Sequence, residues 1–224
     1  MKRLREVRRP LANFFASGVF ELREKLGPIL WQLPPNMRFE PATLDAFLGM
    51  LPADTTAAEA LARSRDWRLK GRARLRFRGP ERRLRHALEV RHASFATEAL
   101  PALLRRHNVA LVVSDTPRLW PRLEELTADF MYLRLHGATR LYGSGYGRAA
   151  INAWAERIAA WRRGRELTRG EAADRRRGPP PVARDVYCYF DNTDVKLRAP
   201  LDARALMARC GNRGPPELPD RPTA

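Results

Sequence analysis

Five short runs of apolar residues, separated by segments with a helical pattern, constrain the fold of this chain more than any other feature. The runs cover residues 27–33, 86–92, 109–115, 130–136 and 186–192. They are almost continuously apolar and rich in Val, Leu and aromatic residues, which is typical of strands buried on both faces of a parallel sheet. We therefore predict five parallel strands.

Amphipathic helices are predicted around these strands. Apolar residues recur at the spacing of one helix face in residues 44–51, 100–104 and 151–161. In the last of these stripes, we expect Trp154 and Trp161 to face the core rather than to form a binding platform. Repeated strand–helix units with this spacing predict an α/β fold with a parallel sheet.

Polar and charged residues gather where the predicted strands end. They are Gln32, Glu89, Arg91, His92, Asp115, Arg134, His136, Asp191 and Asn192. Ligand sites of parallel α/β proteins lie at this edge of the sheet. Because side chains of a strand alternate between its two faces, Glu89 and Arg91 share a face, as do Arg134 and His136. Five strands that all end in polar groups at one edge predict a ligand site.

The candidate catalytic residues are Glu89, Asp115 and His136. Glu89 or Asp115 can serve as a general base, and His136 or His92 as an acid or base near neutral pH. The same three candidates could instead be ligands of a divalent metal for hydrolysis, although no metal-binding spacing such as H-E-x-x-H is present. Buried ion pairs that merely seal the end of the sheet are the structural alternative.

The candidate ligand-binding residues are Gln32, Arg91, His92, Arg134 and Asn192. Arg91 and Arg134 suit a small anionic molecule, because a guanidinium group offers a planar fork of donors to a phosphate or carboxylate. No residue in the chain identifies the substrate.

Positive charge is concentrated in two segments. The chain has 42 basic and 25 acidic residues, a net charge of +17. Residues 63–85 include eleven basic and two acidic residues, and residues 162–184 include eight and three. Neither segment shows a clean apolar period, so we predict two surface loops inserted in one domain (1–210), followed by a flexible tail over 211–224. Codon bias in a GC-rich genome is an alternative source of the arginines.

The first basic segment suggests a second function, binding of nucleic acid. Its arginines would neutralise phosphates, and Trp67 and Phe77 could stack on bases. A solvated loop is the alternative. The two functions differ in their response to salt, since binding driven by phosphate contacts weakens steeply as salt rises.

Membrane insertion and metal modules are excluded by simpler features. No apolar stretch approaches the roughly 18 residues of a membrane-spanning helix, and the two cysteines, Cys188 and Cys210, are too few for a disulfide framework or a zinc module. The N-terminal residues resemble an amphipathic helix rather than a signal peptide, because charges precede the apolar stretch and no cleavage site follows. We expect a cytoplasmic protein.

The chain resembles the YecE-like family, also called domain-of-unknown-function family 72. The blocks that carry the resemblance are LGPILWQLPPNMRF (26–39), LEVRHASF (88–95), VALVVSDT (109–116), TADFMYLRLHG (127–137), LYGSGYGRAAINAWAERIAAW (141–161) and DVYCYFDN (185–192). They follow the family order over residues 1–206. The resemblance implies a TIM-type β/α barrel with a site at its mouth, and no established activity.

The chain departs from this family most at its start. Family members open with a Gly-rich strand, a V-E-x-N-x-x-F-Y strand and a lysine-bearing strand, none of which is present here. We therefore expect five of eight barrel strands, with free edges at the first and the last. Such a chain would be marginally stable or would depend on an oligomer or partner chain. A start codon assigned too late, a genuine truncation and an inactive remnant are the alternatives.

Overall fold

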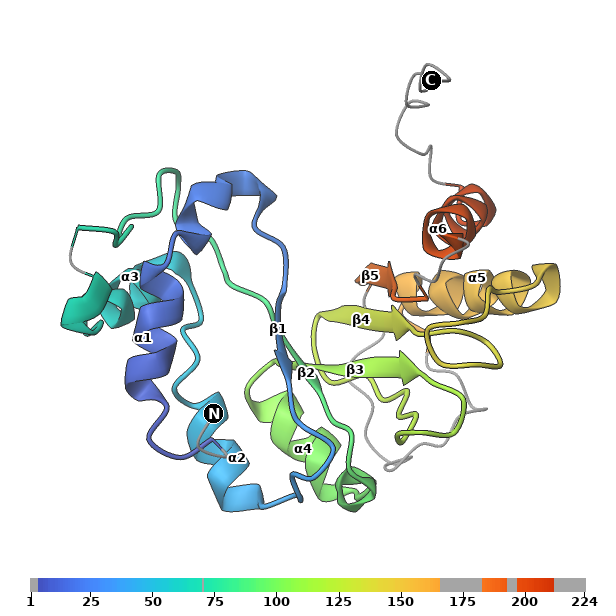
Figure 1. Ribbon diagram of the computed structural model, residues 1–224, viewed down its shortest axis with the longest axis horizontal. Helices are drawn as coiled ribbons and strands as arrows, with labels where there is room; N and C mark the ends of the chain where they lie inside the picture. The colour runs from blue at the N-terminus through green and yellow to red at the C-terminus, as the bar shows by residue number, and fades with distance from the viewer. Residues whose placement is uncertain (1–3, 70, 166–182, 193–196, 212–224) are drawn as a thin grey trace.

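The computed structural model describes residues 4–69, 71–165, 183–192 and 197–211. Its strands form one parallel sheet in the order β1-β2-β3-β4-β5, which curls into a half-barrel (Figure 1). The strands are β1 (Ile29–Gln32), β2 (His86–Glu89), β3 (Ala110–Asp115), β4 (Phe130–Leu135) and β5 (Asp185–Phe190). All five predicted strands and the α/β class are confirmed, and β1 and β5 are the edges of the sheet.

Six α-helices accompany the sheet in the described part of the chain. They are α1 (Arg8–Ala16), α2 (Pro41–Leu48), α3 (Thr55–Arg63), α4 (Ala99–Arg106), α5 (Arg148–Arg162) and α6 (Arg198–Arg209). Three 3₁₀-helices lie at Val19–Lys25, Trp67–Leu69 and Ala93–Phe95. The sequence did not predict α3 or α6. Among the residues described, no helix has the length and apolarity needed to cross a membrane.

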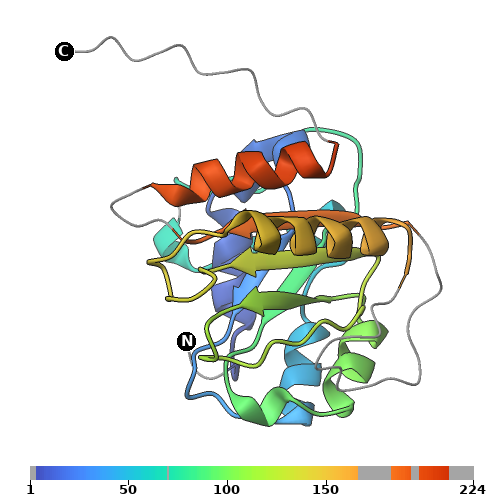
Figure 2. The same cartoon turned by 90° about the vertical axis from the view of Figure 1, so that its right-hand side faces the viewer.

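The helices cover the outer face of the curled sheet (Figures 1 and 2). We call the end of the half-barrel at which the carboxyl ends of the strands lie the mouth. Strand alternation fixes which residues face inward: Ala87 and Glu89 on β2, Val112 and Ser114 on β3, and Arg134 on β4. The register places Ser114 opposite Arg134 and Gln32 opposite Glu89. The carboxyl ends of the strands therefore bring their polar residues to one edge.

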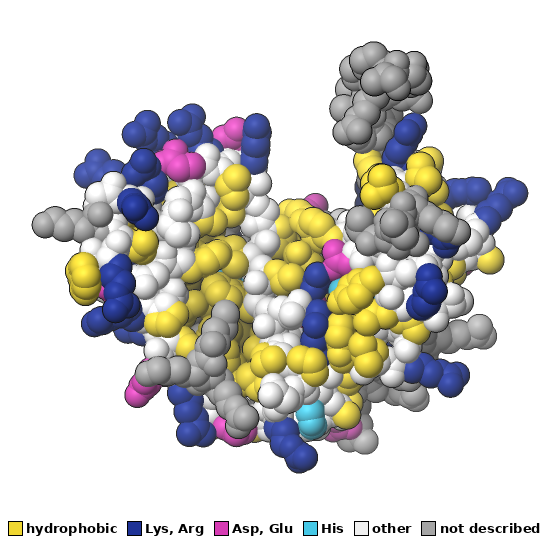
Figure 3. All heavy atoms as spheres, in the orientation of Figure 1, with side chains coloured by type: hydrophobic (Ala, Val, Ile, Leu, Met, Phe, Trp, Pro, Cys, Tyr) yellow, Lys and Arg dark blue, Asp and Glu magenta, His cyan; other side chains and the backbone are white. Residues whose placement is uncertain are grey.

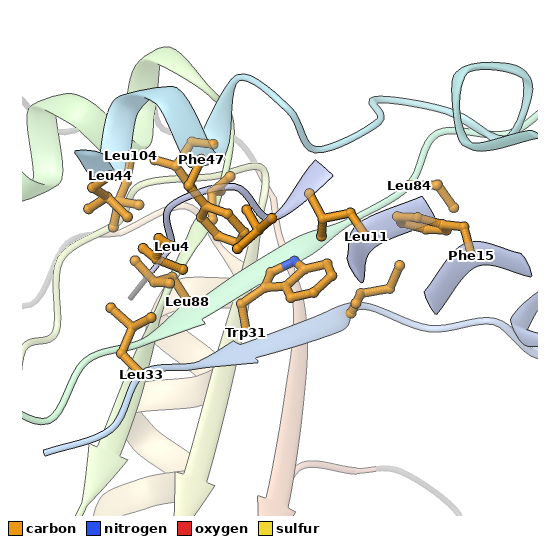
Figure 4. Close-up of a cluster of buried hydrophobic side chains, with 14 of the residues drawn as sticks. Leu4, Leu11, Phe15, Trp31, Leu33, Leu44, Phe47, Leu84, Leu88 and Leu104 are labelled. Atoms are coloured by element: carbon orange, nitrogen blue, oxygen red, sulfur yellow. The ribbon is translucent and has the colours of Figure 1, made fainter. Parts of the chain in front are cut away.

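Two apolar clusters hold the helices against the outer face. In the first, Trp31 of β1 packs against Phe47 of α2 with ring centroids 5.7 Å apart, and its indole Nε1 donates to His86 Nδ1 at 3.1 Å (Figure 4). In the second, Trp154 and Trp161 of α5 are 3% and 0% exposed. The prediction that both tryptophans face the core is confirmed. These clusters give the sheet edge a fixed scaffold.

The first basic segment is more ordered than its sequence suggested. From residue 72 to residue 78, four arginines are exposed while Ala73, Leu75 and Phe77 are partly buried against the first cluster. The expectation of no apolar period was therefore wrong for these residues, because an alternation with period two is present. Most of the second basic segment (166–182) and the tail after residue 211 lie outside the described residues.

Candidate ligand site at the carboxyl ends of the strands

A buried carboxylate, Glu89, is the centre of the polar cluster at this edge. Its side chain is fully buried, and its Oε1 accepts a hydrogen bond of 2.7 Å from Arg91 Nε. Its Oε2 is paired with Arg134 Nη1. Gln32 Oε1 accepts from Arg91 Nη2 and Arg134 Nη1, both at 2.9 Å. The structure thus brings together four predicted residues, which come from β1, β2, β4 and the segment just after β2.

Arg134 reaches across the sheet because its neighbour on β3 is small. Ser114 lies beside it in the register, is 1% exposed and leaves room for the guanidinium group. Arg134 Nη2 also pairs with Asp191, which follows β5. Neighbouring Glu89 and Asp191 raise the pKa of Arg134 against the opposing effect of burial. The arginine therefore joins acidic groups from strands that are not adjacent.

His136 lies at the end of β4 beside this network and is 0% exposed. Neither of its ring nitrogens has a hydrogen-bond partner in the described part of the chain. Its Nδ1 is 3.6 Å from Asp191 Oδ2, which is beyond hydrogen-bond length. Burial, with a further contribution from Arg134, lowers the pKa of His136 and keeps the imidazole neutral at pH 7. A neutral imidazole with two free nitrogens can both accept and donate a proton.

Aromatic side chains from two loops cover the cluster. The guanidinium carbon of Arg91 is 3.7 Å from the ring centroid of Trp120, in the loop after β3. Trp120 and Tyr142 approach His136 edge-on, with ring centroids 5.5 and 5.4 Å away. The sequence analysis did not single out Trp120, because it lies in a loop beyond the end of β3. The only feature of the sequence that could have indicated Trp120 is that it is an aromatic residue in a loop after a strand.

Asp115 belongs to a different network from Glu89 and His136. It pairs in register with Leu135, whose side chain faces outward, so its carboxylate lies on the outer face. Its Oδ2 accepts from the Tyr146 hydroxyl at 3.0 Å, and its Oδ1 is 3.3 Å from Arg122 Nη1. These contacts hold the loop before α5. Asp115 therefore stabilises the outer side of the sheet. It does not lie at the mouth, where a general base was predicted.

Asn192 and His92 also serve the surrounding loops. Asn192 is fully buried, and its amide Nδ2 donates to Ser144 O at 3.1 Å and to Asp202 Oδ2 at 2.7 Å. His92 Nδ1 accepts from the Ser94 backbone N–H at 3.1 Å and caps a short 3₁₀-helix. Neither residue has a recorded contact with the Glu89 network.

The metal triad that the sequence offered as an alternative, Glu89, Asp115 and His136, is not assembled in the described residues. Strand alternation separates Asp115 from Glu89, and the described residues hold no group of three or more His, Cys, Asp or Glu side chains arranged for a metal ion. The donors that do meet at the mouth are two guanidinium groups, two carboxylates and a neutral imidazole. Such a set fits an organic molecule with charged and polar groups better than a cation.

Comparisons with known proteins agree with this fold. A family model described as "Protein of unknown function DUF72" matches residues 1–223. A DUF72 family protein from Thermotoga maritima is similar, with a TM-score of 0.60 and 21% identity over 92% of this chain. A DUF72 family protein from Enterococcus faecalis, in two crystal structures, gives TM-scores of 0.54 and 0.50 at 15% and 14% identity, over 87% and 83% of this chain. Comparison with curated proteins gives no match.

This chain spans less than two thirds of each of those structures, covering 65%, 64% and 61% of their lengths. At such identities the likeness concerns the fold alone. The site is therefore argued from its own contacts.

Proposed function

The chain belongs to the DUF72 family, the YecE-like family that its sequence resembles, and from this premise we propose that its half-barrel is part of a TIM-type β/α barrel whose mouth binds a small organic anion. The established description of the family is one of unknown function, so the proposal rests on the mouth itself. Ligands of such barrels bind where the strands end, which is where the Glu89 network lies.

The observation that carries the proposal is the unpartnered imidazole of His136. Burying a polar group without a hydrogen bond is unfavourable by about 1–3 kcal/mol. A network that served only to seal the sheet would satisfy the ring nitrogens of His136, as Trp31 and Pro52 satisfy those of His86. The free nitrogens of His136 therefore support a bound partner at the mouth.

The neighbouring residues supply binding and orientation. Arg91 and Arg134 have further N–H groups beyond their bonds to Glu89 and Gln32, and these suit a carboxylate or phosphate. Glu89 fixes both guanidinium groups from a fully buried position. Once Trp120 and Tyr142 move aside, His136 accepts a proton from a ligand hydroxyl or a water and returns it to a leaving oxygen, which is the acid–base step of a hydrolase-like reaction.

Ligand binding tests this proposal directly. We would titrate the full chain with inorganic phosphate, a set of sugar phosphates and a set of hydroxycarboxylates, and follow binding by calorimetry and by the His136 imidazole resonances. We expect one class to bind and to shift those resonances. His136→Gln should weaken binding about tenfold or more, whereas the matched variant His107→Gln, in a half-buried histidine paired with Asp45 at 2.7 Å, should bind normally.

Two results would overturn the proposal. If the two histidine variants bind the ligand equally well, the ligand does not bind at the mouth. A chain that is folded but binds none of the three classes would favour the alternative of an inactive remnant, in which the Glu89 network only stabilises the sheet.

A further inference from the structure

Four arginines stand in a regular row on the lobe formed by α1, α3 and the segment after α3. Arg72, Arg74, Arg76 and Arg78 are all exposed, and the residues between them turn inward. We name this row the arginine ladder. Gly71 and Gly79, both with positive φ, bound it at either end. The four exposed arginines alternate along the chain with Ala73, Leu75 and Phe77, which are partly buried.

The ladder lies on an irregular surface segment that is anchored to the protein at several points. Arg74 N donates to Ala16 O at 2.9 Å and forms a parallel bridge with Ser17 at the end of α1. Phe77 N donates to Glu59 Oε1 on α3 at 2.7 Å. The Phe77 ring packs edge-on against Phe20 at 6.4 Å. Phe77 is therefore an anchor, which corrects the expectation that it stacks on bases.

Most of the ladder's charge is uncompensated. Arg74 Nε is 3.8 Å from Glu21 Oε1, while Arg72, Arg76 and Arg78 form no ion pair with any described residue. Figure 3 shows further lysine and arginine side chains around the same lobe. The exposed Arg74–Glu21 pair compensates little of this charge, because ion pairs on the surface are weak. The surface therefore attracts a polyanion.

A stacking platform lies just before the ladder in the chain. Trp67 is 77% exposed, the largest exposed fraction among the large apolar side chains of the described residues. The guanidinium carbon of Arg68 is 5.7 Å from the Trp67 ring centroid and leaves much of the ring accessible. Nucleobases stack on exposed aromatic rings with little dependence on sequence.

We propose that the arginine ladder and Trp67 bind single-stranded nucleic acid, with the phosphates on the arginines and a base on the indole. This surface is separate from the mouth. Its failure or success therefore leaves the proposed ligand site untouched.

Fluorescence anisotropy with labelled dT₁₅ and U₁₅ over a range of salt tests the proposal on the full chain. Four phosphate contacts predict a slope of log K against log salt of about −2.8, which is about a 50-fold loss of affinity between 50 and 200 mM. Replacing Arg72, Arg76 and Arg78 together by Gln should reduce the slope to about −0.7. Trp67→Ala should weaken binding roughly tenfold with the slope unchanged.

The matched control replaces Arg163, Arg165 and Arg209 by Gln, which are exposed residues after α5 and on α6. It lowers the net charge by the same amount and should leave both the affinity and the slope intact. Equal loss in the control and the ladder variant would show attraction by net charge alone and overturn the proposal. Tighter binding to duplex DNA or to vesicles of anionic phospholipid would also overturn it.

Discussion

Replacing Glu89 by Gln tests whether the mouth network is held together by charge. Glu89 is 0% exposed and accepts from both Arg91 and Arg134. Glutamine keeps the shape but removes the charge and turns an N–H group toward one of the two guanidinium donors. Each charge-assisted hydrogen bond contributes about 1.5–3 kcal/mol, and breaking a buried pair typically costs about 3–5 kcal/mol. We expect the free energy of unfolding to fall by about 3–4 kcal/mol.

The assay is urea unfolding followed by tryptophan fluorescence and circular dichroism, at 0.15 M and 1 M NaCl. Asp45→Asn is the matched control, because its side chain is 45% exposed and pairs with Arg106 at 3.3 Å. The control should cost much less than Glu89→Gln, and high salt should reduce its cost further. The cost of Glu89→Gln should hardly depend on salt. A cost below about 1 kcal/mol would refute the reasoning, since the arginines would then be satisfied without Glu89.

Three further changes test the scaffold around the mouth. Burial lowers the pKa of His136, so below about pH 6.5 the unfolded chain takes up a proton that the folded chain does not. The free energy of unfolding, measured with urea, should therefore fall between pH 7.5 and 5.5. The fall should be less steep in His136→Asn. Gly137→Ala should cost more than about 1 kcal/mol in thermal unfolding, because φ is +120° and a Cβ would lie 2.4 Å from Arg140 O, whereas Gly27→Ala should be nearly neutral. Leu88→Ala, at a fully buried position, should cost about 2–5 kcal/mol by the same measurement.

Much of the fold could be predicted because the strands repeat one pattern. Near-continuous apolar runs located all five strands, and the spacing of Trp154 and Trp161 oriented α5. Helix α3 was missed because its apolar face is mostly alanine, and its clearest signal is the cap, where Asp54 Oδ1 accepts from Ala57 N at 2.7 Å. A short side chain gives a weak apolar stripe even where the helix is well packed.

The alternating pattern of the arginine ladder is present in the sequence, but it is not visible when residues 63–85 are considered as one segment. Residues 63–85 have no single period, whereas the seven residues between Gly71 and Gly79 alternate strictly. A run of that length bounded by glycines is the ordinary signal of an extended segment. The segment is anchored by Ala73, Leu75 and Phe77, whose burial required the neighbouring α1 to be placed first.

The sequence predicted some residues of the candidate site correctly and others not, because a strand places alternate residues on opposite faces. Gln32, Glu89 and Arg134 meet on the inner face, so their position at strand ends was sufficient to predict that they lie close together. Asp115 is the last residue of a strand in which every residue from 109 to 113 is apolar, and such a run does not show which of its residues face inward. Only the register with Leu135 assigns Asp115 to the outer face. A carboxylate at the end of a strand therefore predicts only that the residue lies at this edge of the sheet. Whether the carboxylate belongs to the site depends on the face to which the register of its strand assigns it.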